Sequence, residues 1–161
     1  MPEICSQCGA RLVPEQACQD VFYLGQIKEV ENPAYYAVHH LSVPCYMLQH
    51  NFYSRQGWLE AYGLLAEFVN GLTPGEARRR NRELMDSGKR TFSITRGAKL
   101  DGVEQVKWRF TVADVRLDSA EHYCADVRRW AESVLADSAA LVRAAQTDAP
   151  ETQPAERKRR K

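Results

Sequence analysis

Three cysteines close to the start of this 161-residue chain constrain its fold more than any other feature. Cys5 and Cys8 form a Cys-x-x-Cys motif that Gly9 follows, and Cys18 comes ten residues after Cys8. Two intervening residues let both sulfurs reach one zinc ion, about 2.3 Å from each. A thioredoxin-like redox motif is the rival interpretation, but it belongs to a βαβ pattern that this segment lacks. The cysteines therefore predict a bound zinc that fixes the N-terminal segment to the rest of the fold.

Two helices are predicted after the cysteines. Apolar residues between positions 16 and 31 have helical spacing, and Asn32-Pro33 combines an N-cap residue with proline at the first helical position. The second helix then extends to about His50, with a kink expected at Pro44. If the two helices are antiparallel about Asn32, residue 18 faces residue 46 or so.

The antiparallel pair of predicted helices indicates the fourth ligand, because this arrangement places Cys18 near Cys45 and His50 and away from His39. His39 and His50 are about 16 Å apart along a regular helix, so one ion cannot bind both unless Pro44 breaks it. Cys45 is the leading substitute for His50 as the fourth ligand. His39 takes the place of His50 instead if the first helix is absent or displaced. The predicted zinc ligands are Cys5, Cys8, Cys18 and His50.

The rest of the chain predicts more helices and one hairpin. Helical spacing covers residues 58–69, a capping box at Thr73 to Glu76 starts a short basic helix, and another capping signature starts a long helix near residue 120. Alternating apolar residues in 105–112 predict a strand, with its partner near residues 92–94. The fold class is therefore mainly α (α+β): a helical bundle with one β-hairpin and an N-terminal segment like a zinc knuckle.

Composition limits the location and the kinds of partner. The net charge is +1, and an odd count of five cysteines cannot close into disulfides without a remainder. No run of about 18 apolar residues could span a membrane, and the first residues do not resemble a signal peptide, so we expect a cytoplasmic protein. Cys124 is expected in the core. We expect one zinc-stapled domain over residues 1–146 and a disordered basic tail over 147–161.

Arginines concentrate in the predicted short helix, and further basic residues lie on or near the predicted hairpin, so the two together could bind phosphate groups. Neighbouring acidic residues favour a solvated helix face instead. Nucleic-acid binding is therefore the third of three functional hypotheses. The candidate anion-binding residues are Arg78, Arg79, Arg80 and Arg82.

The motifs together resemble an uncharacterised bacterial family that is recorded only as a domain of unknown function. They are Cys5-x-x-Cys8-Gly9, Cys18, Asn32-Pro33, His39-His40-Leu41-Ser42-Val43, Tyr46 and Gln49-His50. Asn51 stands where proline is usual in that family. The resemblance implies Cys18, His39 and His50 as motif positions, and it implies no activity.

The first functional hypothesis is a non-enzymatic interaction or accessory module with a structural zinc and a protein partner. The second is a zinc-dependent, hydrolase-like enzyme with an open coordination position near His39 and with His39 or Glu29 as base. The chain has no His-Glu-x-x-His, no phosphate-binding glycine loop and no Gly-x-Ser-x-Gly, which ranks the enzyme second.

Overall fold

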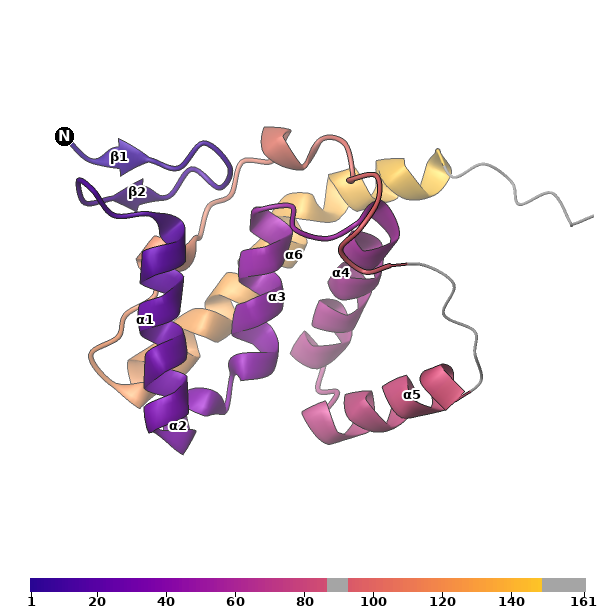
Figure 1. Cartoon of the computed structure of the whole chain (residues 1–161), viewed down its shortest axis with the longest axis horizontal. Helices are drawn as coiled ribbons and strands as arrows, with labels where there is room; N and C mark the ends of the chain where they lie inside the picture. Colours follow the sequence, from indigo (N-terminus) through magenta and orange to yellow (C-terminus); the bar gives the residue numbers. More distant parts are fainter. Residues whose placement is uncertain (87–92, 149–161) are drawn as a thin grey trace, which may run out of the picture.

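The computed structural model describes residues 1–86 and 93–148, and within this part the protein is mainly helical (Figure 1). This confirms the predicted fold class, including a single two-stranded hairpin among the described residues. The helices are α1 (Cys18–Glu31), α2 (Pro33–Tyr36), α3 (His39–Gln49), α4 (Arg55–Val69), α5 (Pro74–Asp86) and α6 (Ala120–Thr147), with two 3-10 turns, η1 (Val103–Gln105) and η2 (Val112–Asp114). The strands β1 (Glu3–Ile4) and β2 (Arg11–Leu12) pair antiparallel, with Glu3 opposite Leu12.

Helix α6 is the longest element, with 28 residues, and it packs against both α3 and α4. Its buried stripe includes Val127, Trp130 and Val134, each at most 1% exposed. Trp58 of α4 and Leu48 of α3 are fully buried as well. The Trp58 indole N–H donates to the Leu48 carbonyl at 3.1 Å, so even the polar atom of this core residue is satisfied. These three helices form the hydrophobic core that supports the N-terminal segment.

Predicted helix starts are confirmed at their caps. The Asn32 side chain accepts from the Ala34 N–H, and the Ser119 side chain accepts from the His122 N–H. At α5 the Glu76 carboxylate accepts from the Thr73 N–H at 2.8 Å. Each of these bonds satisfies an orphan amide in a first turn.

The predicted second helix is wrong in one respect, because it is two helices rather than one. The chain leaves helical geometry at Val38 (φ -114°, ψ 13°), between α2 and α3, while Pro44 lies inside α3. At this break Val38 is 1% exposed, and nearby Tyr35 packs its ring 5.2 Å from that of Tyr123 on α6. Tertiary packing of these side chains therefore redirects the chain where local propensity gave no signal.

The predicted position of the hairpin is also wrong. The observed hairpin, β1 and β2, surrounds the Cys-x-x-Cys motif, and no strand forms in the described residues 93–119. The alternation itself is real, since Trp108 and Phe110 are half-buried while Lys107 and Arg109 are exposed. Alternation reports that an extended chain has two faces, not that a partner strand pairs with it. The proposed partner is only partly testable, because Phe92 lies outside the described residues.

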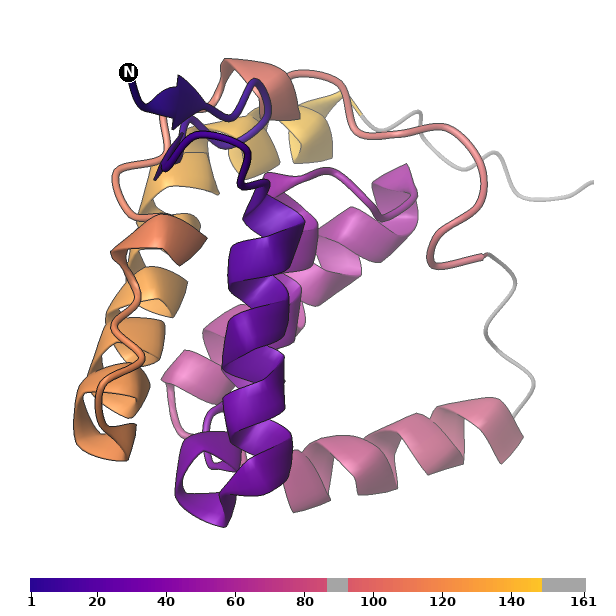
Figure 2. The ribbon, with the colours of Figure 1, turned by 60° about the vertical axis from the view of Figure 1, so that its left-hand side comes forward.

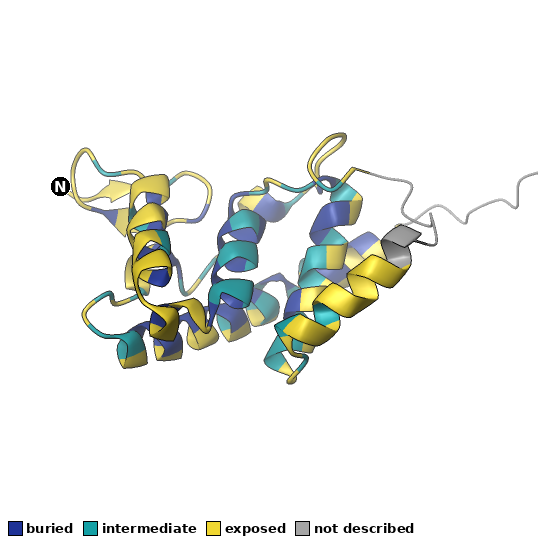
Figure 3. Ribbon diagram, turned by 60° about the horizontal axis from the view of Figure 1, so that its bottom comes forward, coloured by how far each residue is buried: buried dark blue, intermediate teal, exposed yellow. Residues whose placement is uncertain are grey.

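Helix α5 stands apart from the other helices (Figures 1 and 2). All four predicted anion-binding arginines lie on it and are exposed, and Figure 3 shows that most of the described surface of α5 is exposed. One of them, Arg80, pairs with Glu67 of α4. Most of the predicted tail, residues 149–161, lies outside the described residues. Across the described part of the chain, no helix combines the length and apolarity needed to cross a membrane.

Candidate metal centre

The hairpin β1–β2 holds two of the four predicted ligands. Cys5 follows β1, and its N–H donates to the Ala10 carbonyl at 2.9 Å. The Gly9 N–H donates back to the Cys5 carbonyl at 2.9 Å, with Gly9 at φ 74°, a conformation that glycine adopts without strain. This tight turn closes the loop that carries Cys5 and Cys8, and Cys8 is only 2% exposed.

Cys18 is the first residue of α1 and is buried. Ala17 caps this helix, and its N–H donates to the Asp20 carboxylate at 2.8 Å. The unpaired amides of a first turn carry partial positive charge, which favours a thiolate at this position. The start of α1 is therefore suited to an anionic ligand.

His50 follows the last residue of α3 and is 3% exposed. Its Nδ1 lies 2.8 Å from the Tyr46 carbonyl, which can only accept, so Nδ1 carries the proton. The lone pair is then on Nε2, which lies 3.8 Å from the Cys5 sulfur. A backbone carbonyl that fixes the tautomer in this way is a common feature of metal-binding histidines.

The structure brings together the four residues predicted from the sequence. The ligand atoms of Cys5, Cys8, Cys18 and His50 all lie within 4.8 Å of one another, and the Cys8 and Cys18 sulfurs are 3.5 Å apart. All the cysteines are free thiols, so no disulfide competes for these sulfurs. Thiolates bound about 2.3 Å from a tetrahedral zinc lie about 3.8 Å from each other. The cluster therefore has the spacing needed to hold one metal ion.

Electrostatics within the cluster favour removal of the proton from the Cys8 sulfur and oppose its removal from the Cys18 sulfur. A hydrogen bond with the Cys18 thiol lowers the pKa of Cys8 to about 4, and the same bond raises the pKa of Cys18. Burial alone would lower the pKa of His50, but hydrogen bonds to the Cys8 sulfur and the Tyr46 carbonyl raise it. The cysteine pair thus shares a proton that a bound cation would displace.

Aromatic rings cover one side of the cluster. The Tyr46 ring stacks on Phe22 of α1 with centroids 4.1 Å apart, and its centroid lies 4.3 Å from that of His50. The Phe52 ring stacks on the His50 ring with centroids 6.2 Å apart. Burial raises the pKa of Tyr46 to about 12, so this phenol stays neutral beside the thiols. The rings join α1 to α3 next to the ligands and hold His50 in place.

The two alternative ligands lie outside the cluster. Cys45 is fully buried, and burial raises the pKa of its thiol well above the usual value. His39 begins α3, at the opposite end of that helix from His50. The Gln49 side chain, next to His50 in the sequence, bonds outside the cluster: it accepts from the Trp130 indole and donates to the Phe110 carbonyl. Cys124 is buried, which confirms the expectation for that residue.

His39 takes part in a second polar cluster, centred on Glu29. The Glu29 carboxylate is 2% exposed and accepts from His39 Nδ1 at 2.6 Å, from Ser42 Oγ at 2.8 Å and from Tyr123 Oη at 2.7 Å. Glu29 falls on the same face of α1 as Cys18, Phe22 and Gly25, all buried. This i, i+4, i+7, i+11 spacing is the sequence signal that would have marked it as an interior carboxylate.

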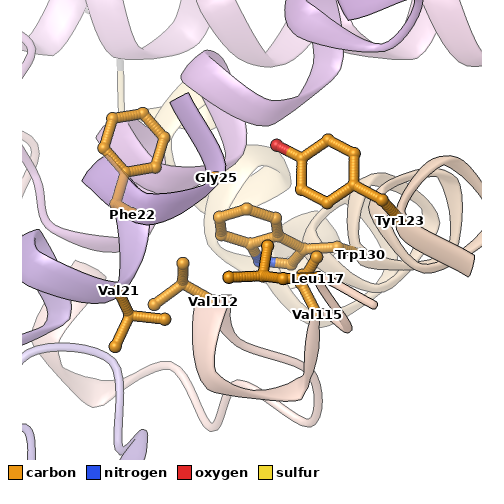
Figure 4. A pocket seen from close by; sticks show the side chains of 8 residues that line it. All are labelled: Val21, Phe22, Gly25, Val112, Val115, Leu117, Tyr123 and Trp130. Atoms are coloured by element: carbon orange, nitrogen blue, oxygen red, sulfur yellow. The ribbon is translucent and has the colours of Figure 1, made fainter. Parts of the chain in front are cut away.

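Two hollows differ greatly in size. Figure 4 shows the smaller, a cavity of about 10 Å³ where α1, η2 and α6 meet, lined by residues such as Phe22, Val112 and Trp130. It has room for about one water molecule, so it is a packing gap and not a ligand site. A groove of about 640 Å³ lies between α4 and α5, with Arg78 and Arg80 among its lining residues.

Comparison with known protein families assigns the chain to one of them. A family model matches residues 3–139, from the start of the hairpin into α6. The chain belongs to a family of unknown function, DUF5946. The DUF5946 match includes all four clustered residues. No curated protein and no solved structure matches the chain.

Proposed function

We propose that this DUF5946 protein binds one zinc ion through Cys5, Cys8, Cys18 and His50, and that it is a non-enzymatic accessory module that binds a protein partner. The observation that carries the proposal is the convergence of four ligand atoms within 4.8 Å from three separate segments. Three segments, the β1–β2 loop, the start of α1 and the end of α3, direct thiol and imidazole groups toward one point. Such a convergence is expected where these groups bind one metal ion together.

Zinc fits this donor set better than other common metals. Thiolate sulfur and imidazole nitrogen are the usual ligands of structural zinc, while magnesium and calcium require oxygen ligands. A Cys₃His set is a known composition of closed, tetrahedral structural sites. Copper(I) and iron–sulfur clusters also take thiolates, so metal analysis must identify the ion.

The expected role of the zinc is structural, because four protein ligands fill its coordination shell. It would connect the β1–β2 loop to the start of α1 and the end of α3. Besides the stacked rings of Phe22 and Tyr46, which join α1 to α3, the Gln7 amide of the loop lies 3.4 Å from the His50 carbonyl. Zinc thus supplies the cross-link that a two-stranded hairpin of two-residue strands cannot supply alone.

Metal content is the first test. The purified protein should contain near-equimolar zinc by elemental analysis, and His50→Ala should lower that content much more than His39→Ala does. His122→Ala is a matched control, since His122 is on the surface and pairs with Asp118. A fully folded protein without metal, or a larger loss with His39→Ala, would contradict the proposal.

Coordination separates this proposal from the hydrolase alternative. X-ray absorption should report three sulfurs and one nitrogen with no exchangeable water. A zinc-bound water would favour an enzyme, because a catalytic zinc keeps one position open. The distance of His39 from the clustered residues, at the far end of α3, argues against a base beside the metal.

A nucleic-acid partner is the remaining alternative, and the exposed arginines of α5 are the observation that favours it. Glu76 and Glu83 on the same helix are also exposed and offset that charge. Retention of DNA or RNA that decreases steeply with salt, and that Arg79→Glu abolishes, would support this partner over a protein.

A further inference from the structure

Helix α1 is apolar on both of its faces. Its inner face is buried against η2 and the cysteine cluster, whereas no other described element packs against its outer face; α1 lies at the front of the molecule in Figure 2. Four of the eight exposed residues of α1 are large and apolar. They are Tyr23 (52% exposed), Leu24 (47%), Ile27 (52%) and Val30 (85%).

These side chains form one stripe, because residues three, four and seven apart lie on the same side of a helix. A helix that is apolar on all sides is normally covered on all sides. Isolated apolar residues on a surface are common, but a contiguous stripe marks a contact surface. The outer face of α1 therefore has the composition of an interface.

Charged residues on the outer face of α1 indicate which molecule binds there. Asp20 and Lys28 lie one turn before and one turn after Leu24, and both are exposed. An antiparallel pair of α1 helices with its two-fold axis at Leu24 brings each Asp20 beside the partner's Lys28. Asp20 is already held in position, since its carboxylate accepts from the Ala17 N–H.

We propose that the outer face of α1 binds the same face of a second copy of this chain, antiparallel about Leu24. The row formed by Asp20, Leu24 and Lys28 is an i±4 ridge, and packing such ridges against each other is the commonest helix contact in globular proteins. The contact is isologous, as in most homodimers. It does not depend on the proposed zinc, because no clustered ligand lies on this face.

The interface is small. One helix face buries less than the roughly 800 Å² per partner of a standard interface, so the dimer is reversible, with a dissociation constant roughly in the micromolar range. Self-association is then visible only in experiments that vary concentration. Sedimentation velocity from low to high micromolar protein should show a monomer that converts to a dimer.

Substitutions on the stripe provide the first arm of the test. Leu24→Glu and Ile27→Glu should each leave the protein monomeric over this range. Leu64→Glu is the matched control, because Leu64 is 40% exposed on α4, away from the stripe, and its substitution should leave the dimer unchanged. Circular dichroism of every variant verifies the fold. A wild-type protein that stays monomeric, or a dimer that survives Leu24→Glu, overturns the proposal.

Charge reversal tests the antiparallel arrangement. Lys28→Glu alone places like charges beside Asp20 twice, and Asp20→Lys alone does the same with cations, so each homodimer should weaken about tenfold. An equimolar mixture of the two variants restores both opposite-charge pairs in a heterodimer, which should associate as tightly as wild type. Failure of the mixture to associate overturns the antiparallel pairing. Asp20→Lys also removes the hydrogen bond to the Ala17 N–H and could fray the start of α1, so Lys28→Glu serves as an independent test. The Lys28→Glu dimer should be weaker than the wild-type dimer in low salt and should regain its affinity in 1 M salt. A Lys28→Glu dimer as tight as wild type in low salt overturns the pairing.

Discussion

Glu29 is a carboxylate buried among three helices, where an ionised group loses its hydration. Its two oxygens receive hydrogen bonds from His39 and Ser42 of α3 and from Tyr123 of α6. Three donors replace the lost water, which is the condition for a buried charge to be tolerated. His39 in turn stacks on Tyr36, with centroids 4.8 Å apart, and its side chain remains 38% exposed. Glu29 thus connects α1 to the helices that form the core.

Replacement of Glu29 by glutamine should lower the free energy of unfolding by about 3 kcal/mol, because a glutamine amide cannot accept on both sides. Tyr123→Phe removes one of the three donors and should cost only about 1 kcal/mol. Urea denaturation monitored by circular dichroism compares the two. Equal, small losses would show that the Glu29 cluster is incidental to stability.

Asp126 gives a test of pH dependence. The Arg116 side chain donates to both of its oxygens, at 2.8 and 2.9 Å, and the Arg116 N–H adds a third bond. These bonds, led by the side-chain pair, hold the pKa of Asp126 below its ordinary 3.8. Because the folded pKa is depressed, the stabilisation is present above about pH 4 and is lost as pH falls through the folded pKa.

Asp126→Asn should therefore lower the free energy of unfolding by about 2 kcal/mol at pH 7, and the deficit relative to wild type should shrink below pH 4. Urea denaturation at pH 7, 5 and 3 measures this. Asp101→Asn, at an exposed position, is the control and should be neutral throughout. A deficit that stays constant down to pH 3 would assign the effect to packing instead of charge.

Helix α4 contains two glycines with opposite surroundings. A Cβ on Gly57 would lie 2.3 Å from the backbone carbonyl oxygen of Ile94, whereas a Cβ on Gly63 would meet nothing within 4 Å. The chain at Ile94 passes this close because the Ser54 N–H donates to the same carbonyl at 2.7 Å. Gly57 is thus required by contact between segments, and Gly63 is not.

Alanine substitutions should accordingly act in opposite directions. Gly57→Ala should destabilise the protein by about 2 kcal/mol, since backbone must move, while Gly63→Ala should stabilise it by about 0.5–1 kcal/mol through helix propensity. Thermal denaturation of both variants tests this. Stabilisation by Gly57→Ala would mean that residues near Ile94 do not pack against α4 in solution.

Local sequence signals predicted the helices well because they act locally. Capping side chains such as Asn32 and Ser119 satisfy amides within their own turn, so the residue type nearly determines the helix start. The break between α2 and α3 and the lack of a strand near Trp108 depend instead on distant partners. Alternation at Trp108 reports that one face of the chain packs against the hydrophobic core, and no local pattern distinguishes that from a sheet.

The clustered residues could be predicted because ligand chemistry and helix geometry agree. Counting residues back from Asn32 predicts that Cys18 lies beside the end of the next helix. The prediction holds despite the break between α2 and α3, because α1 and α3 are antiparallel neighbours (Figure 1). Glu29 was harder to interpret, since only its position on the buried face of α1 separates it from an exposed glutamate. The Tyr123 partner is 94 residues away, and sequence spacing gives no information about it.

The whole molecule should respond unevenly to removal of the proposed metal. The hairpin β1–β2 pairs over only four residues, while α3, α4 and α6 share a core that includes Trp58, Trp130 and Leu65. Without the metal, the three thiols and His50 would lose their common partner, and the hairpin and the first turn of α1 should open first.

Chelation should therefore raise amide hydrogen exchange in residues 3–20 by at least tenfold while amides of α6 near Trp130 keep their protection. Returning zinc should reverse the change, and Cys8→Ser should reproduce it without chelator. Mass-spectrometric hydrogen exchange on wild type and on Cys45→Ser, a buried cysteine outside the cluster, distinguishes local opening from global loss. Global unfolding on chelation would mean that the core depends on the metal, whereas no change in exchange would mean that the four clustered residues hold nothing that stabilises the hairpin.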